Sequence, residues 1–184
     1  MMQVQYERTF DRCYPTASRI CRVDVHHGEE DIYASILPRA LADAVFASSP
    51  HIESGVLLSP STGHYYVTVG EEGNEKGFKE SIISCYSDFV HVFEPSILEG
   101  TASCLEDPEK VIIPESMAKR MFGKEPAVGK SIYCKDEIWY IDQKNFTVGG
   151  VYKDFPENAQ MKNSIYIRMK EDWGKDDWYS QNFM

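Results

Sequence analysis

The chain has 184 residues and a formal net charge of −10 at pH 7, with 42% hydrophobic and 26% charged residues. A chain of this length buries about 70% of its unfolded surface and fits one domain, or two small lobes that share one surface. The acidic balance argues against a nucleic-acid partner and against an anionic membrane surface, because phosphates bind to basic faces.

No stretch approaches the roughly 20 apolar residues of a membrane helix. The N-terminal stretch MMQVQYERTF lacks the apolar core of a signal peptide. Taken alone, these features indicate a cytosolic protein or a soluble piece of a larger one.

The five cysteines are scattered and never closer than eight positions, which fits neither a zinc site nor a thioredoxin-like motif. Free thiols are the simplest interpretation, and one or two disulfides stay open for an oxidising compartment.

The first part of the chain predicts two short strands and a helix. Residues 20–25 alternate apolar and polar side chains, which is typical of a strand, and residues 32–37 predict a second one. Pro38 can occupy the first turn of a helix. An apolar stripe follows it at helical spacing, and Ser48-Ser49-Pro50 ends the helix. The stripe comprises Ala40, Leu41, Ala44, Val45 and Phe46.

The middle of the chain predicts a hairpin and then a linker. Residues 52–59 and 64–69 read as two strands joined by the turn Pro60-Ser61-Thr62-Gly63. The polar, acidic and glycine-rich segment Gly70–Gly77 is the candidate boundary between two lobes. A strand is expected over 82–86, followed by a short helical turn capped by Asp88 and carrying Phe89, Val90 and Phe93. We expect that turn to end at Leu98–Gly100 and a loop to follow over 101–110.

The best-specified unit is Val111–Tyr133. Its β-branched start predicts a buried strand, which Pro114 ends before a helix. Gly123 is placed to end that helix, and Pro126 and Gly129 shape a turn into a second strand. The apolar helix face consists of Met117, Ala118, Met121 and Phe122. Further strands are expected over 146–151 and 164–169. Strands interspersed with a few short helices predict an α+β fold with mixed sheets.

The sequence Gly129-Lys130-Ser131 superficially resembles a phosphate-binding loop. Such a loop needs a glycine five positions before the Gly-Lys pair, after a strand and before a helix. Lys124 occupies that position, and here a helix comes before and a strand after. A plain turn is therefore favoured.

No other group of residues predicts catalysis. His26 and His27 lie beside Glu29, Glu30 and Asp31, but adjacent histidines point in different directions, so a solvated turn is favoured over a metal site. Cys85 with His91 lacks an orienting pattern, and His51 and His64 are isolated. The acidic pairs Glu106-Asp107, Glu171-Asp172 and Asp176-Asp177 read as solvated faces. Asn145-Phe146-Thr147 matches the glycosylation acceptor, a pattern common by chance. We assign no catalytic, cofactor-binding or metal residue.

Several motifs, in order along the chain, resemble the MacB-like periplasmic core domain of FtsX-type ABC transporter permeases, especially the versions common in Bacteroidetes. Residues 6–10 and 18–23 are similar to the family's opening, with Cys21 in place of a tyrosine. Residues 38–42 and 49–53 are similar to its helix and following strand. Residues 88–100 resemble its "D-x-x-F-F-x-x-F…L-x-x-G" segment. Residues 111–130 resemble "V-x-x-x-S-x-A-x-x-x-F-G…P-x-G-K", with Pro114 in place of the usual Ser or Thr. Residues 146–156 match most closely.

The resemblance implies a two-lobe extracytoplasmic domain between the first two membrane helices of a permease. A porter-like βαβ lobe would begin over 1–75, an inserted sabre-like lobe would span 76–165, and 166–184 would return toward the first lobe. The family's returning strand and helix would follow Met184. The family's residues are structural, so the resemblance implies no enzyme activity and no cofactor.

The implied function is to transmit ATP-driven conformational change across the membrane and to contact substrate or partner proteins on the periplasmic side of the inner membrane. The implied partners are the permease's own membrane helices, a cytoplasmic ABC ATPase, a second permease in a homodimer or pseudo-dimer, and periplasmic adaptor proteins. An alternative is a soluble periplasmic module that binds a peptide, lipid or sugar, which would need an apolar pocket with convergent polar groups. An acid-dependent hydrolase would need two close carboxylates in a cleft.

Overall fold

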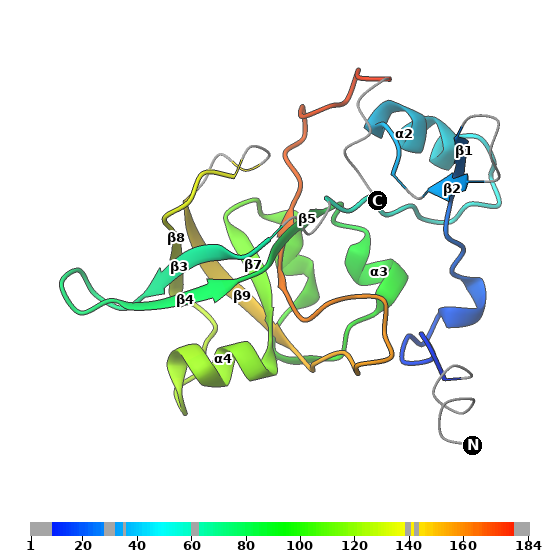
Figure 1. Ribbon diagram of the computed structural model, residues 1–184. Helices are drawn as coiled ribbons and strands as arrows, with labels where there is room; N and C mark the ends of the chain where they lie inside the picture. Colours follow the sequence, from blue (N-terminus) through cyan, green and yellow to red (C-terminus); the bar gives the residue numbers. More distant parts are fainter. Residues whose placement is uncertain are drawn as a thin grey trace.

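The computed structural model describes residues 9–27, 32–34, 36–59, 63–138, 141 and 144–178. Its centre is an eight-stranded sheet in the order β4-β3-β8-β9-β7-β10-β5, with β6 also paired to β9 (Figure 1). In that order the strands are β4 (Lys76–Glu80), β3 (Tyr65–Val69), β8 (Ser131–Cys134), β9 (Asn145–Tyr152), β7 (Lys110–Pro114), β10 (Ile165–Arg168) and β5 (Ile82–Cys85), and β6 is Ile97–Gly100.

The helices and a small second sheet surround this central sheet. The helical elements are η1 (Ala17–Arg19), α2 (Arg39–Ala47), α3 (Phe89–Phe93), η2 (Ala102–Glu106) and α4 (Glu115–Phe122). A separate antiparallel pair consists of β1 (Val25–His27) and β2 (Ile32–Ala34). In Figure 1, β1, β2 and α2 lie together on one side of the molecule, whereas the β3–β4 hairpin extends on the other.

The strand directions confirm the predicted α+β class with a mixed sheet. β7 runs parallel to β9 and β10 runs parallel to β5, while the other strand pairs of the sheet are antiparallel. Parallel neighbours require crossover connections. The helix α4, followed by β8, connects β7 to β9 and covers one face of the sheet.

The unit from β7 through α4 to β8 forms as the sequence predicts. Pro114 occupies the N-cap position of α4, and Gly123 ends the helix with φ +71°, which favours glycine. Met117, Ala118 and Met121 are buried against the strands. Phe122 is only half-buried, and the Lys130 Nζ atom lies 5.2 Å from its ring centroid. Of the predicted apolar helix face, Phe122 therefore belongs to the core only in part.

Two large clusters of buried side chains cover the two faces of the sheet, and a third lies beneath α2. The first cluster joins α4 to inward residues of most strands, including Val67, Val111, Ile132, Phe146 and Ile167. The second joins α3, η2 and Tyr14 to the opposite face, and its members include Phe89, Leu105, Ile112, Tyr152 and Tyr166. The third contains Leu37, Ala42, Leu57 and Met169. The N-terminal segment and the segment after β10 therefore share one core.

The predicted hairpin in the middle of the chain is wrong, and the segment predicted as a linker holds the turn of a different hairpin. β3 pairs with β4, not with residues 52–59, and the register runs from Tyr65 opposite Glu80 to Val69 opposite Lys76. Gly70–Gly77 thus holds a hairpin turn and the start of a strand, in which Gly70 and Gly73 take φ of +112° and +88°. Both segments carry turn residues, and the pairing partner of β3 decides which one closes a hairpin. Residues 60–62 lie outside the described residues.

Other boundaries also differ from the predictions. Residues 20–24 do not form a strand in the described part of the chain, and Val23 is exposed, because no neighbouring strand pairs with them there. Ile97–Gly100 is a strand on β9, not a helix end, and the expected loop over 101–110 contains η2. Asp88 takes the N-cap position of α3 without a side-chain bond to the helix. In α2 the buried residues are Arg39, Ala40 and Ala42, whereas Ala44 of the predicted stripe is exposed.

The five cysteines are free thiols in this structure. Cys13 and Cys21 are exposed, whereas Cys85, Cys104 and Cys134 are buried. Burial raises the pKa of Cys104 to about 11 and also raises the pKa values of Cys85 and Cys134 above their ordinary value of 9.0. The buried thiols are therefore protonated and poorly nucleophilic near neutral pH.

We expect iodoacetamide at about pH 8 to alkylate Cys13 and Cys21 in the native chain and to reach the three buried cysteines only in denaturant, as mass spectrometry would show. The raised pKa values also determine how stability depends on pH. Because the folded state disfavours the thiolates, the free energy of unfolding should decrease as pH rises above about 9. Rapid native alkylation of Cys104 would contradict its burial.

A pair of substitutions in α4 tests its packing. Met117→Ala should lower the free energy of unfolding by about 2–5 kcal/mol, because a buried side chain is removed. Phe122→Ala should cost about half as much, since only part of its ring contacts the core. Denaturant titration of both variants measures the difference. An equal or larger loss for Phe122→Ala would show that its ring packs as a full core residue.

Candidate functional site

The phosphate-loop look-alike is a turn, as its spacing predicts. Gly129 takes φ +85°, and Ser131 begins β8 directly afterwards. The Lys130 ammonium pairs with Glu125 and lies over the Phe122 ring, which turns it toward α4. Pairing with Lys130 lowers the pKa of the exposed Glu125 carboxyl.

The other predicted candidates do not converge on one site. In the part of the chain that the structure describes, no group of three or more His, Cys, Asp or Glu could hold a metal ion. His26 and His27 belong to β1, and residues 28–31 lie outside the described residues. Cys85 is fully buried and donates to the Ile167 carbonyl, with 3.6 Å between sulfur and oxygen, whereas His91 is exposed. Glu106, Glu171, Asp172 and Asp176 are exposed.

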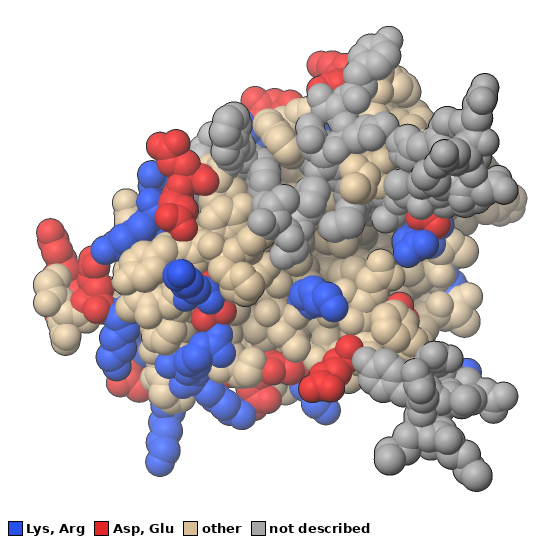
Figure 2. Space-filling view, in the orientation of Figure 1, with Lys and Arg blue, Asp and Glu red and all other residues tan. Residues whose placement is uncertain are grey.

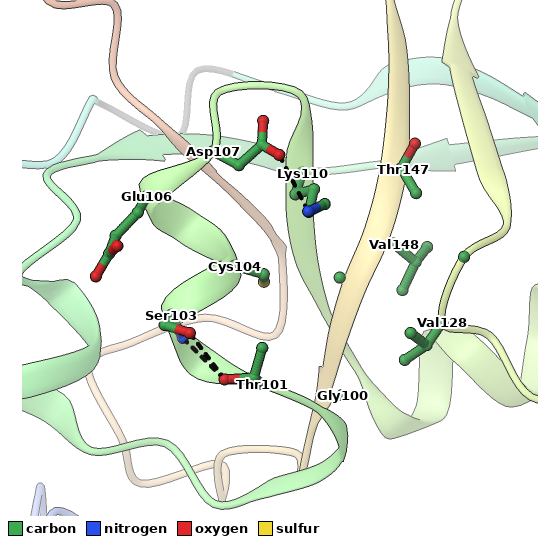
Figure 3. A pocket seen from close by; sticks show the side chains of 12 residues that line it. Gly100, Thr101, Ser103, Cys104, Glu106, Asp107, Lys110, Val128, Thr147 and Val148 are labelled. Atoms are coloured by element: carbon green, nitrogen blue, oxygen red, sulfur yellow. Dashed lines mark hydrogen bonds and ion pairs between the residues drawn. The ribbon is translucent and has the colours of Figure 1, made fainter.

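A hollow of about 550 Å³ opens between η2 and the sheet (Figure 3). It lies where β9 exchanges one neighbour, β8, for another, β6. Its lining consists of Gly100, Thr101, Ser103, Cys104, Glu106, Asp107, Lys110, Val128, Gly129, Thr147, Val148 and Gly149. Four of the twelve lining residues are neutral hydroxyl or thiol residues, three are glycines, and two, Val128 and Val148, have aliphatic side chains.

The polar groups of the hollow bond mainly to each other. Thr101 Oγ1 accepts a bond from the Ser103 amide and lies 2.9 Å from the Ser103 hydroxyl. Asp107 Oδ2 lies 3.1 Å from Lys110 Nζ, and its other oxygen accepts the Glu109 amide at 3.0 Å. The bond from the Glu109 amide and the pairing with Lys110 lower the pKa of Asp107. The carboxylate is therefore a poor proton donor or acceptor near neutral pH.

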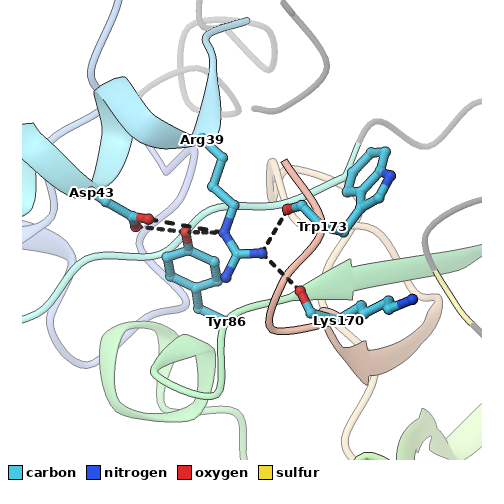
Figure 4. A network of polar contacts seen from close by, with 5 residues as sticks. All are labelled: Arg39, Asp43, Tyr86, Lys170 and Trp173. Atoms are coloured by element: carbon cyan, nitrogen blue, oxygen red, sulfur yellow. Dashed lines mark hydrogen bonds and ion pairs between the residues drawn. The ribbon is translucent and has the colours of Figure 1, made fainter. Parts of the chain in front are cut away.

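A second polar cluster surrounds Arg39, which is only 7% exposed (Figure 4). Arg39 Nε donates to the Tyr86 hydroxyl at 2.9 Å, and Nη1 donates at 2.7 Å to each of the carbonyls of Lys170 and Trp173. The Tyr86 hydroxyl donates in turn to Asp43 Oδ1 at 2.6 Å. The guanidinium carbon lies 5.1 Å from the Tyr86 ring centroid. Burial, and the bond to Asp43, raise the pKa of Tyr86, so it stays a neutral donor.

This Arg39 cluster, comprising Arg39, Asp43, Tyr86, Lys170 and Trp173, joins three distant parts of the chain (Figure 4). β5 and β10 are parallel, so their C-terminal ends emerge side by side, and the Met169 amide bonds to the Cys85 carbonyl at 2.7 Å. Tyr86 comes directly after β5, and Lys170 lies two residues beyond β10. Arg39 at the start of α2 thus binds the ends of two neighbouring strands at once.

Sequence reasoning missed this cluster. Its only local signal is the i, i+4 pair of Arg39 and Asp43 at the start of an otherwise apolar helix. Nothing in that pair identifies Tyr86 or the carbonyl acceptors, which lie 47 to 134 positions away.

None of the helices in the described part of the chain has the length and hydropathy that a bilayer-crossing helix requires. The structure instead resembles domains of membrane transporters. A domain described as part of a permease protein from Porphyromonas gingivalis superposes with a TM-score of 0.68 at 20% identity, over 83% of this chain and 68% of that one. The periplasmic region of MacB from Actinobacillus actinomycetemcomitans gives a TM-score of 0.50 at 20% identity, over 72% of this chain and 56% of that one.

No curated protein sequence matches the chain. A family model, described as the MacB-like periplasmic core domain, matches residues 3–181, which is nearly the whole chain. The motif resemblance is thereby confirmed along with the fold. The chain belongs to the family of MacB-like periplasmic core domains of ABC transporter permeases.

Proposed function

We propose that this domain acts without chemistry of its own, as a rigid body that carries ATP-driven motion from the membrane to the periplasmic face of a transporter. ATP would be hydrolysed by a separate cytoplasmic domain or subunit, reached through the permease's membrane helices. The family membership supports the placement of this domain on the periplasmic side of a transporter permease. The observation that carries the rigid-body role is the Arg39 cluster, because motion can be transmitted only through a body that does not deform.

The proposal includes two lobes, with boundaries adjusted to the structure. Since Gly70–Gly77 holds a hairpin turn, we place the crossing between lobes after Ser59, where the segment that lies along β5 ends in the described part of the chain. The first lobe then comprises β1, β2, α2 and the segment after β10. The second comprises the whole eight-stranded sheet with α3, η2 and α4, and Tyr14 and Ala17 of the N-terminal segment pack against it. The Arg39 cluster lies at the junction between them.

The partners of this function would be a second permease, in a homodimer or pseudo-dimer, and periplasmic adaptor or substrate proteins. A transporter that alternates between two states needs contacts that differ between those states. Surfaces far from the α2 end of the molecule, where the β3–β4 hairpin extends (Figures 1 and 2), would make such contacts.

The volume of the hollow beside η2 supports a second candidate, an extracytoplasmic module that binds a peptide, lipid or sugar. Its volume of about 550 Å³ falls in the range of ligand sites, about 300–1,000 Å³. Its wall, however, has few apolar side chains, and its charged groups Asp107 and Lys110 already pair with each other. A thermal-shift screen with peptides, lipids and sugars distinguishes the two, because a ligand that binds the folded state raises Tm.

Arg39→Lys tests the junction. A lysine has no planar fork and cannot reach the Tyr86 hydroxyl and two carbonyls together. We expect the free energy of unfolding to decrease by about 1.5–3 kcal/mol, and amide exchange at residues 170–173 to accelerate. Denaturant titration and hydrogen-exchange mass spectrometry measure both effects.

The matched control is Arg22→Lys, because Arg22 is exposed and, within the part of the chain that the structure describes, pairs with its neighbour Asp24 at 2.9 Å. That change should cost less than about 0.5 kcal/mol. If Arg39→Lys were as mild as Arg22→Lys, the Arg39 cluster would not hold the lobes together.

Spin labels test transmission in the complete permease with its ATPase. With Cys13 replaced by serine, one label on Cys21 and one on Lys124→Cys span the two lobes of a single copy. We expect this distance to stay constant between the nucleotide-free and ATP-bound states, since the body is rigid. With Cys21 also replaced, labels at Lys124→Cys alone report the distance between two copies, which should change with nucleotide.

Double electron–electron resonance in membranes measures both distances, and diluting labelled with unlabelled permease separates the distance within a copy from that between copies. An inter-copy distance that is the same in both nucleotide states would contradict the proposed transmission.

A further inference from the structure

The two outer strands of the eight-stranded sheet, β5 and β4, differ in whether another segment of the chain bonds to their outer edge. β5 is covered along its edge: the Ser59 amide donates to the Ser84 carbonyl at 2.8 Å, and the Tyr86 amide donates to the Leu57 carbonyl at 3.2 Å. At the other end of the sheet, β4 pairs only with β3 within the described residues. One row of backbone groups on Lys76–Glu80 is therefore available to another strand.

The sequence of β4, Lys-Gly-Phe-Lys-Glu, complements itself in one antiparallel register. Centred on Phe78, two copies place Lys76 of one strand opposite Glu80 of the other, on both sides of the centre. Lys79 then faces Gly77, which has no side chain, so no like charges oppose each other. Opposite charges directly across an antiparallel pair stabilise it.

The surroundings of these side chains fit that register. Phe78 packs against the first core cluster, and Glu80 accepts Arg120 Nη2 through Oε1, so both point to the α4 side of the sheet. Lys76 lies two residues before Phe78 in the strand, so its side chain points to the same face of the sheet, and it is exposed. Glu80 is only 7% exposed, and none of the described residues bonds to its Oε2. The partner's Lys76 ammonium would reach this oxygen along the edge of β4.

We propose that β4 is a contact between two copies of this domain, formed by antiparallel pairing of Lys76–Glu80 with itself about Phe78. The pairing would make one sheet continuous across both copies. The inference rests on the proposed function, because it names the surface through which the two permeases of that proposal meet.

Two five-residue strands bury much less surface than the about 1,000 Å² of a stable interface. The contact therefore depends on tethering. Two copies fixed in one membrane assembly face each other at an effective concentration on the order of millimolar, so a weak edge contact can form and break as the transporter changes state.

Cysteine crosslinking in the complete permease in membranes tests the register. With Cys13 and Cys21 replaced by serine, Phe78→Cys places two thiols directly opposite across the two-fold axis, with Cβ atoms about 4.5–5.5 Å apart, and mild oxidation should give a disulfide-linked dimer. Leu98→Cys, an exposed position on β6 away from this edge, should give none. Both are measured without nucleotide and with ATP bound, and the dimer should form in at least one state.

A charge change supplies an independent readout. Lys76→Glu in the Phe78→Cys background should lower the crosslink yield several-fold, because two carboxylates then oppose each other. Lys124→Glu makes the same charge change on an exposed residue outside β4 and should leave the yield unchanged. If Phe78→Cys fails to fold, spin labels on the exposed Lys79→Cys take its place and should report a shorter inter-copy distance than labels on Leu98→Cys.

No dimer at position 78 in either state, or equal yields at positions 78 and 98, overturns the edge pairing. If that happens while the inter-copy distance at position 124 still changes with nucleotide, only this inference fails. If position 78 crosslinks while position 124 never moves, the pairing stands and the proposed transmission fails.

Discussion

The pairing of β9 with strands on both of its edges is the constraint on which the sheet depends. Its first half binds β8, its second half binds β6, and β7 pairs along the other edge from Thr147 to Tyr152. The register with β7 shifts between Val111 and Ile112, which leaves Gly149 as the extra residue. A Cβ atom at Gly149 would lie 2.5 Å from the Cys104 Cβ, and one at Gly100 would lie 2.1 Å from the Gly149 oxygen. Only glycine fits at Gly100, where two backbones approach closely, and at Gly149, against which the Cys104 side chain lies.

The change of neighbour along β9, from β8 to β6, explains the hollow beside η2. β8 and β6 cannot both contact β9 at one position, so an opening remains between them, walled by backbone and short side chains. Val148 bonds there to the Gly129–Lys130 turn, through its carbonyl at 2.8 Å and its amide at 2.9 Å. The opening is thus a consequence of how three strands share one partner. A cavity selected for a ligand would instead gather apolar side chains around a few unpaired polar groups, and Asp107 and Lys110 are paired.

The parts of the fold that the sequence predicts correctly are those specified by local signals. In Val111–Tyr133 the β-branched run, the proline and the glycine each have one structural meaning. The hairpin could not be predicted, because Pro60–Gly63 and Gly70–Gly77 both carry turn chemistry and the choice depends on the partner of β3. The Arg39 cluster was even harder to predict from the sequence. A buried arginine needs several acceptors, and Tyr86, Lys170 and Trp173 come together only through the parallel pairing of β5 with β10.

Parallel pairing has a further consequence for the load-carrying role that we propose. Two parallel strands present both C-terminal ends at one place, and Arg39 binds residues just beyond each of those ends, so α2 is attached to the sheet through two strands rather than one hinge. A single connection would let α2 swing, whereas attachment at Tyr86 and at residues 170–173 resists rotation. β10 lies between β5 and β7, and β7 is paired with β9. A displacement applied at α2 therefore enters the hydrogen-bonded interior of the sheet and reaches β4 through consecutive strand pairs, with no loop in the path.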